Sequence, residues 1–134
     1  MSETAKDRIP PFVYVADSDR GTADSLAAVL NENGYEAIAF SSGEQLVEAA
    51  TVLKPAIVIT AVSMEGITGV EAAIRICQNI PECRVVLCFA LHSADESLRR
   101  IAAENRFVVF RGPVDPGALL QCLDGITGRA PTAA

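Results

Sequence analysis

Five short apolar segments alternate with five longer segments that carry apolar residues at helical spacing. The short, strand-like segments occupy residues 12–16, 36–40, 56–62, 84–90 and 107–110. Two of them, 56–62 and 84–90, are apolar on both faces, which is typical of central strands in a parallel sheet. Because the connections are short, the alternation predicts an α/β fold. We expect a doubly wound, five-stranded parallel sheet with helices on both faces.

Start and stop signals mark the helices between these strands. Ser42 stands three residues before Gln45, a spacing typical of the capping box at a helix start. Thr68 and Glu71 repeat this spacing, and Gly34 is placed to end a helix. The sequence therefore predicts helices within 21–34 and 41–54, from 68 onward, over 94–104 and after 115.

Length and charge limit the class of protein. With 134 residues, half of them apolar, the chain is expected to form one domain with a buried core. We expect that domain at 11–127, between loose tails at 1–10 and 128–134. The formal charge of −6 argues against a nucleic acid or a membrane surface as partner. No segment has the apolar length of a signal peptide or a membrane span, which predicts a cytoplasmic protein.

Four cysteines stand at positions 77, 83, 88 and 122, and no two of them form a CxxC pair. Since the chain has a single histidine, this spacing does not indicate a zinc site, and we expect no metal or other cofactor. Cys88 lies in an apolar strand, as expected of a buried thiol in a reducing compartment. A redox switch formed by Cys77 and Cys83 is the alternative.

The carboxyl ends of the strands are where a sheet of this kind places a functional crevice. These exits fall at 17–20, 61–66, 89–93 and 111–115. The third strand ends at Ala61, although a strand end of this type often carries a reactive side chain. A methyl group at this position cannot act as an acid, a base or a nucleophile.

The motifs at these exits resemble the receiver domains of bacterial two-component response regulators, over roughly residues 11–127. Family members often have PDLVLLDxxMPGxDGxE around the third strand, where this chain has PAIVITAVSMEGITGVE at 55–71. They have Lys-Pro before the last helix, where this chain has Gly-Pro. The matching residues, in the family's order, are Pro55, Met64, Gly66, Gly69, Glu71 and Pro113. The resemblance implies the receiver fold, a flavodoxin-like fold of five β-α units.

The resemblance also implies where phosphotransfer groups would stand. In the family, aspartyl phosphorylation uses an acceptor aspartate, two acids that help hold Mg²⁺, a hydroxyl and a lysine. The acceptor falls at Ala61, the two acids at Asp17 and Ser18, the hydroxyl at Phe89 and the lysine at Gly112. Only Asp17 keeps its chemical group, so we expect a pseudo-receiver that is neither an enzyme nor phosphorylated on aspartate. Phe89 is expected to pack into the vacated space.

A module of this kind is expected to act by contact with another signalling protein, such as a histidine kinase, a regulator or an effector. We expect no output domain after Gly128, and therefore output through a partner. In the family, the fourth helix, fifth strand and fifth helix form the partner face, which also allows a homodimer. The residues expected there are Arg99, Arg100, Phe107, Val109 and Arg111.

Other functions stay open on the sequence alone. The domain could be an atypical receiver that is phosphorylated at a substitute residue, with Thr60 and Ser63 as candidates. It could be a flavodoxin-type electron carrier, because residues 18–25 faintly resemble a phosphate loop. It could also bind a small molecule beside His92 and Ser93, just past the fourth strand.

Overall fold

The computed structural model describes residues 12–89, 96–111 and 114–128. One five-stranded sheet has the order β2-β1-β3-β4-β5, and every neighbouring pair is parallel. Its strands are β1 (Phe12–Ala16), β2 (Glu36–Phe40), β3 (Ile57–Ala61), β4 (Arg84–Phe89) and β5 (Val108–Arg111). The predicted α/β fold with a doubly wound parallel sheet is confirmed.

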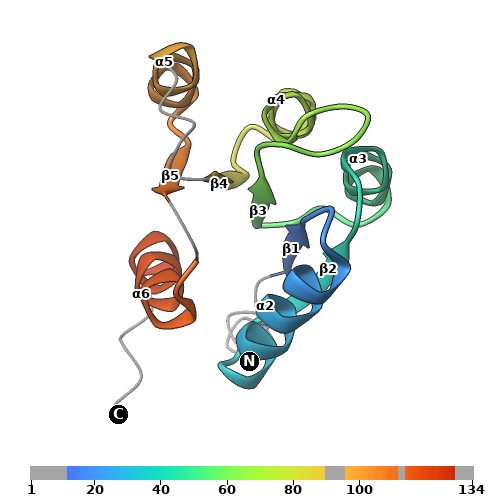
Figure 1. Cartoon of the computed structure of the whole chain (residues 1–134). Helices are drawn as coiled ribbons and strands as arrows, with labels where there is room; N and C mark the ends of the chain where they lie inside the picture. Colours follow the sequence, from blue (N-terminus) through green and yellow to red (C-terminus); the bar gives the residue numbers. More distant parts are fainter. Residues whose placement is uncertain (1–11, 90–95, 112–113, 129–134) are drawn as a thin grey trace, which may run out of the picture.

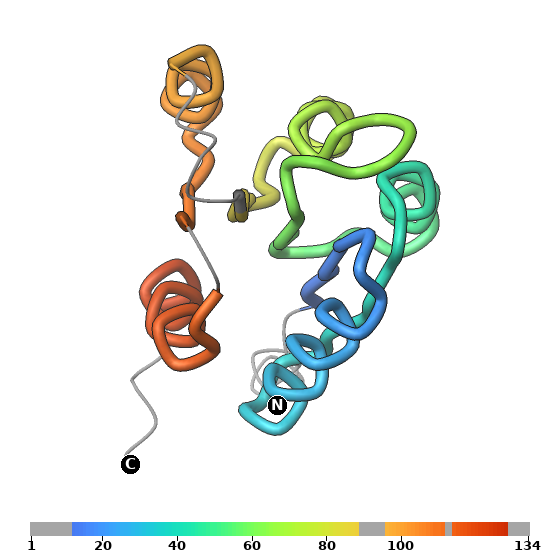
Figure 2. Tube along the Cα trace, in the orientation of Figure 1, coloured from blue at the N-terminus to red at the C-terminus, as the bar shows by residue number. Residues whose placement is uncertain are grey.

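Helices cover both faces of the sheet (Figure 1). One face carries α2 (Arg20–Glu32) and α6 (Pro116–Thr127). The other face carries α3 (Gly43–Val52), α4 (Gly69–Asn79) and α5 (Glu96–Asn105), and Figure 2 traces the same two layers along the chain. Every helix in the described segments is too short or too polar to cross a lipid bilayer.

The sheet divides the core into two apolar layers, because side chains alternate along each strand. Val58 and Leu87 pack toward α3, α4 and α5. Ile59 and Val86, their neighbours in the chain, pack toward α2 and α6 instead. All four side chains are at most 1% exposed, which explains why these two strands carry apolar residues at consecutive positions.

The fifth strand starts one residue later than the predicted 107–110. Phe107 belongs to the turn that ends α5, because its N–H donates to the carbonyl oxygen of Ala102 at 2.8 Å. Arg106, just before it, has a left-handed φ of 61°. The Phe107 side chain then turns into the core and is 8% exposed. A helix-end turn therefore uses the aromatic residue that the sequence pattern assigned to the strand.

The two predicted capping boxes form only in part. The hydroxyls of Ser42 and Thr68 each accept a hydrogen bond from the main-chain N–H three residues later, at 3.1 Å. The second hydrogen bond of each capping box, from the main-chain N–H of Ser42 or Thr68 to the side chain three residues later, does not form. Gln45 Oε1 accepts from the N–H of Ser41, and Glu71 pairs with Arg75 at 2.8 Å. An arginine one turn along the helix competes successfully for the glutamate.

Candidate functional site

The strand exits bring three side chains to one edge of the sheet. β3 is central and ends at Ala61, whose Cα is paired with that of Cys88 in β4. On the other side, Ala16 in β1 pairs with Thr60 in β3, and Asp17 follows directly. Among the described residues, Asp17, Ala61 and Cys88 therefore place a carboxylate, a methyl group and a thiol at the rim, which is the edge of the sheet where we expect the family's acidic centre.

Asp17 is half-buried and its carboxylate is engaged by its own turn. Its Oδ1 accepts a hydrogen bond from the N–H of Asp19 at 2.9 Å. Asp19 in turn is the N-cap of α2, because its Oδ1 accepts from the N–H of Thr22 at 3.3 Å. Ser18, between the two acids, is exposed. The two aspartates thus shape the start of α2.

The residues at this rim do not fit a magnesium ion. Mg²⁺ needs oxygen ligands in near-octahedral geometry, and proteins supply them mainly as carboxylates. Of the three residues that we expect at the family's ligand positions, Asp17, Ser18 and Ala61, only Asp17 carries a carboxylate. Over 12–89, 96–111 and 114–128, no three His, Cys, Asp or Glu side chains lie close enough together to hold a metal ion.

Cys88 is a rim residue that the sequence pattern assigned simply to the core. Burial is the main reason why the pKa of its thiol is raised, to about 12, and the nearby Asp17 charge and Cys122 add to the effect. The thiol is therefore neutral at physiological pH and is a poor nucleophile. The sequence alone does not show that Cys88 lies beside Ala61, because this neighbourhood depends on the register of β3 against β4.

Thr60 is not available as a substitute phosphate acceptor. Its side chain is fully buried, at 0% exposure, and lies on the opposite face of β3 from Ala61, as strand alternation predicts. Its hydroxyl donates to the carbonyl oxygen of Ala61 at 3.0 Å. Ser63 is exposed in the loop that follows β3.

Gly69 lets α4 begin directly against the end of β3. The N–H of Gly69 donates to the carbonyl oxygen of Val62 at 2.9 Å. A Cβ atom at position 69 would lie 1.8 Å from the carbonyl oxygen of Ala61, far inside van der Waals contact. The match to the family's glycine at this position therefore has a local physical reason: the backbones meet too closely for any side chain.

Glu44, in the first turn of α3, fixes the loop between β3 and α4. Its carboxylate accepts a hydrogen bond from the N–H of Ile67 at 3.0 Å. The loop turns at Gly66, which has a φ of 78° and lies against the same carboxylate. This clamp joins residues that are 23 positions apart, so no local sequence pattern indicates it.

We expect this clamp to weaken in acid. The hydrogen bond from Ile67 is the first cause that lowers the pKa of Glu44, followed by its own N–H and by Arg75. Because the folded-state pKa is the lower one, the contribution is complete above the unfolded value near 4.5 and is lost as the pH falls through the folded value. Amide exchange of Ile67 should therefore accelerate between pH 6 and pH 3.5, on the order of several-fold.

Replacing Glu44 by glutamine provides the control for this pH effect. The amide keeps an oxygen acceptor but has no charge to titrate. Exchange at Ile67, corrected for the intrinsic pH dependence of the amide, should then be the same at both pH values. An equal acceleration in both proteins would mean that another group controls the loop.

The residues predicted for the partner face are only partly on the surface. Arg99 and Arg100 on α5 are exposed, and so is Arg111 at the end of β5. Val109 is half-buried. Phe107 differs from the expectation: it is a core residue at 8% exposure, so it supports this region from below and offers no contact.

Several predicted site residues lie outside the described part of the structure. They are Gly112, His92, Ser93 and the side chain of Phe89. The expected packing of Phe89 against Ala61, and the small-molecule site beside His92, therefore stay predictions.

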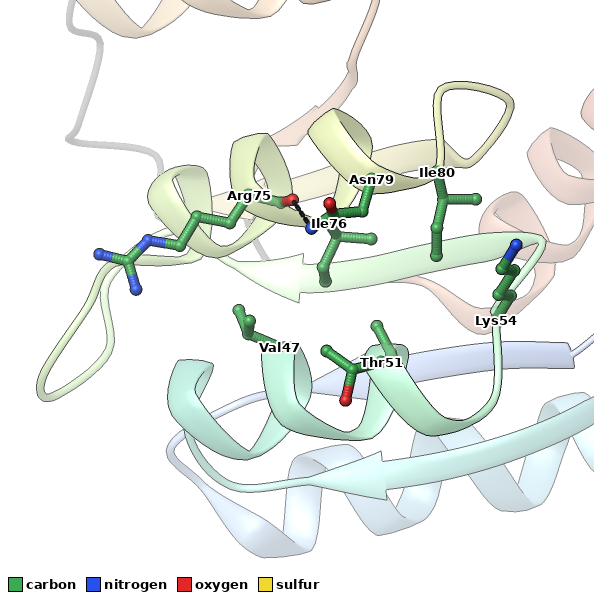
Figure 3. A pocket seen from close by; sticks show the side chains of 8 residues that line it. Val47, Thr51, Lys54, Arg75, Ile76, Asn79 and Ile80 are labelled. Carbon is green, nitrogen blue, oxygen red and sulfur yellow. Dashed lines mark hydrogen bonds between the residues drawn. The ribbon is translucent and has the colours of Figure 1, made fainter.

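A groove between α3 and α4 lies away from the strand exits (Figure 3). Its volume is about 290 Å³, and its floor is apolar, with Val47 from α3 and Ile76 from α4. Lys54 and Arg75 stand at its rim. No residue of the rim around Ala61 lines this groove, so the groove is separate from that rim.

Comparisons with known proteins agree with the fold described above. A family model for the response regulator receiver domain matches residues 13–124. Chemotaxis protein CheY4 of Vibrio cholerae is 16% identical, with a TM-score of 0.77 over 87% of this chain and 98% of that one. A two-component transcriptional regulator AraC from Clostridium phytofermentans is 21% identical, with a TM-score of 0.75 over 89% and 93%. A receiver domain of a modulated diguanylate cyclase from Desulfovibrio desulfuricans is 23% identical, with a TM-score of 0.76 over 90% and 96%. No curated protein matches the chain.

Proposed function

This chain belongs to the response regulator receiver domain family, and we propose that it is a pseudo-receiver, which signals by contact with another protein and is not phosphorylated on aspartate. It has no enzymatic activity of its own and works in the cytoplasm. The observation that carries the proposal is Ala61 at the carboxyl end of the central strand β3. A methyl group there cannot attack a phosphoryl donor.

The neighbours of Ala61 support the same proposal. The Asp17 carboxylate already accepts the N–H of Asp19, and the Cys88 thiol is neutral because burial raises its pKa. Thr60 is fully buried. An atypical receiver with a substitute acceptor at the end of β3 therefore lacks an accessible, activated nucleophile among these residues.

We place the contact surface at the end of the sheet formed by α5, β5 and α6 (Figure 1). β5 is an edge strand, and three exposed arginines lie on α5 and β5: Arg99, Arg100 and Arg111. Among the described residues the ion pairs are Arg20–Asp24 and Arg75–Glu71, so these three guanidinium groups have no carboxylate partner there. In a domain with a formal charge of −6, this surface suits an acidic patch on another signalling protein.

The test is to reverse two of these charges. The variant R99E/R111E should capture at least about tenfold less partner protein from a lysate of the source cells. The reason is that each charge pair at the rim of the interface contributes on the order of 1 kcal/mol or more. The measurement is quantitative mass spectrometry of cross-linked complexes. Sedimentation of the purified chain shows in parallel whether a second copy is the partner.

The matched control is R20E/R75E, which changes the net charge equally on α2 and α4. This control should capture the same protein as the unmodified chain does. Equal loss in both variants would indicate a non-specific charge effect and would contradict the proposed surface. Capture that is unchanged in R99E/R111E would contradict it as well.

A further inference from the structure

Cys77 and Cys83 lie together where α4 ends and β4 begins. The Sγ of Cys77 lies 3.7 Å from the carbonyl oxygen of Cys83. The Sγ of Cys83 lies 3.7 Å from the next carbonyl oxygen, that of Arg84. Six positions separate the cysteines in the chain. The turn around Pro81 brings their sulfur atoms close to two successive carbonyl oxygens, those of Cys83 and Arg84.

The two thiols differ in access. Cys77 is partly exposed, whereas Cys83 is 5% exposed. In a redox-active dithiol, the accessible thiol reacts with the oxidant to form a sulfenic acid, and the second thiol then forms the disulfide with it. The difference in exposure between Cys77 and Cys83 suits these two roles. Neither sulfur takes part in the rim around Ala61, so this pair is separate from the degenerate acidic centre.

The electrostatics of the four cysteines favour this pair over the other two. A hydrogen bond from Cys83 lowers the pKa of Cys77, while the same pairing and burial raise the pKa of Cys83. Burial raises the pKa of both Cys88 and Cys122. Since the thiolate is the reactive form, Cys77 is the cysteine on which oxidation should begin.

We propose that Cys77 and Cys83 form a redox-active dithiol that hydrogen peroxide converts reversibly into a disulfide. The Cys77 sulfur attacks one peroxide oxygen, the O–O bond breaks, and a sulfenic acid and water form. The Cys83 sulfur then attacks the sulfenic sulfur, the S–O bond breaks, and the Cys83 proton leaves with the hydroxide as a second water. The dithiol loses two electrons, and the peroxide gains two.

The disulfide would tie the end of α4 to the start of β4. The other end of α4 abuts the carbonyl oxygen of Ala61 through Gly69. Oxidation therefore acts on the helix that borders the degenerate centre without using an aspartate. The proposal does not depend on the pseudo-receiver function, because an oxidised pair is compatible with either phosphorylation state.

The experiment treats the full, reduced chain with hydrogen peroxide, blocks free thiols with N-ethylmaleimide and digests the protein with trypsin. Cleavage after Arg75 and Arg84 releases residues 76–84, which contain Cys77 and Cys83 and neither of the other cysteines. After oxidation, we expect this peptide to be two hydrogens lighter than the reduced peptide and to carry no N-ethylmaleimide. After reduction with dithiothreitol, it should carry two N-ethylmaleimide groups. Before oxidation, Cys77 should react with the reagent at least about tenfold faster than Cys88 does.

Two variants separate this result from general oxidation. Cys77→Ser, at a partly exposed position, should abolish the lighter peptide, whereas the double variant Cys88→Ser/Cys122→Ser should retain it. Oxygen added to residues 76–84 without loss of two hydrogens would overturn the proposal. A disulfide that involves Cys88 or Cys122, or two thiols that stay fully reactive, would overturn it equally.

Discussion

Replacing Gly69 by alanine is expected to destabilise the domain by about 3 kcal/mol, because the new methyl group has no room. A Cβ atom at this position would lie 1.8 Å from the carbonyl oxygen of Ala61 and 2.9 Å from the hydroxyl oxygen of Thr60. The carbonyl oxygen is backbone of the central strand β3 and the hydroxyl belongs to a fully buried side chain, so neither can move aside as an exposed, flexible side chain would. Instead, α4 must shift away from the sheet, which disturbs the hydrogen bond from Gly69 to Val62. Urea unfolding followed by circular dichroism measures the loss.

Gly125→Ala is the matched control for this substitution. Gly125 lies inside α6, and a Cβ atom there would have no neighbour within 4 Å. Alanine should therefore stabilise the protein by about 0.5–1 kcal/mol through helix propensity. If Gly69→Ala proved as harmless as Gly125→Ala, the close approach of α4 to the end of β3 would be wrong.

Replacing Leu123 by alanine is expected to destabilise the domain by about 3 kcal/mol, which lowers the midpoint of thermal unfolding by roughly 10 °C. Leu123 is 0% exposed and packs, with Leu119, between α6 and the face of the sheet that α2 also covers. Neighbours such as Ile59 and Val86 belong to rigid strands and cannot close the cavity. Differential scanning calorimetry gives the shift.

Val52→Ala serves as the comparison for a large apolar side chain. Val52 is 84% exposed at the end of α3, so its truncation removes little buried surface. The unfolding free energy should change by less than about 0.5 kcal/mol. A Leu123→Ala effect as small as this one would contradict the packing of α6 on the sheet.

The sheet could be predicted from the sequence because its signals are local. Consecutive apolar residues in β3 and β4 indicate strands buried on both faces, and the structure places both inside the sheet. Gly34 ends the first helix in a left-handed conformation, with a φ of 91°, as its position predicted. The strand order β2-β1-β3-β4-β5 comes from the structure, because the alternation of strands and helices along the chain does not determine it.

Contacts between distant residues could not be predicted in the same way. The clamp from Glu44 to Ile67 joins the first turn of α3 to the loop after β3, and the pairing of Ala61 with Cys88 depends on strand register. Phe107 looked like part of a strand, but the left-handed turn at Arg106 directs its side chain into the core. In each case the tertiary fold decides the outcome, and periodicity along the chain carries no information about it.

The proposed loss of chemistry at the candidate site can be argued from the sequence, because the functional group that a residue carries does not depend on the fold. Ala61 and Ser18 have no carboxylate in any fold. What the structure adds is the state of the groups that remain: Asp17 accepts the N–H of Asp19, and Thr60 is inaccessible. Gly112 and the side chain of Phe89 lie outside the described residues, so their roles stay predictions.

The most direct test of the central claim is the intact mass of the purified chain after incubation with acetyl phosphate and Mg²⁺. A family member that retains its acceptor aspartate, treated in parallel, shows that the reagent is active. The claim that Ala61 leaves this domain without a phosphate acceptor predicts an unchanged mass. The gain of one labile phosphoryl group that depends on Mg²⁺ would contradict it.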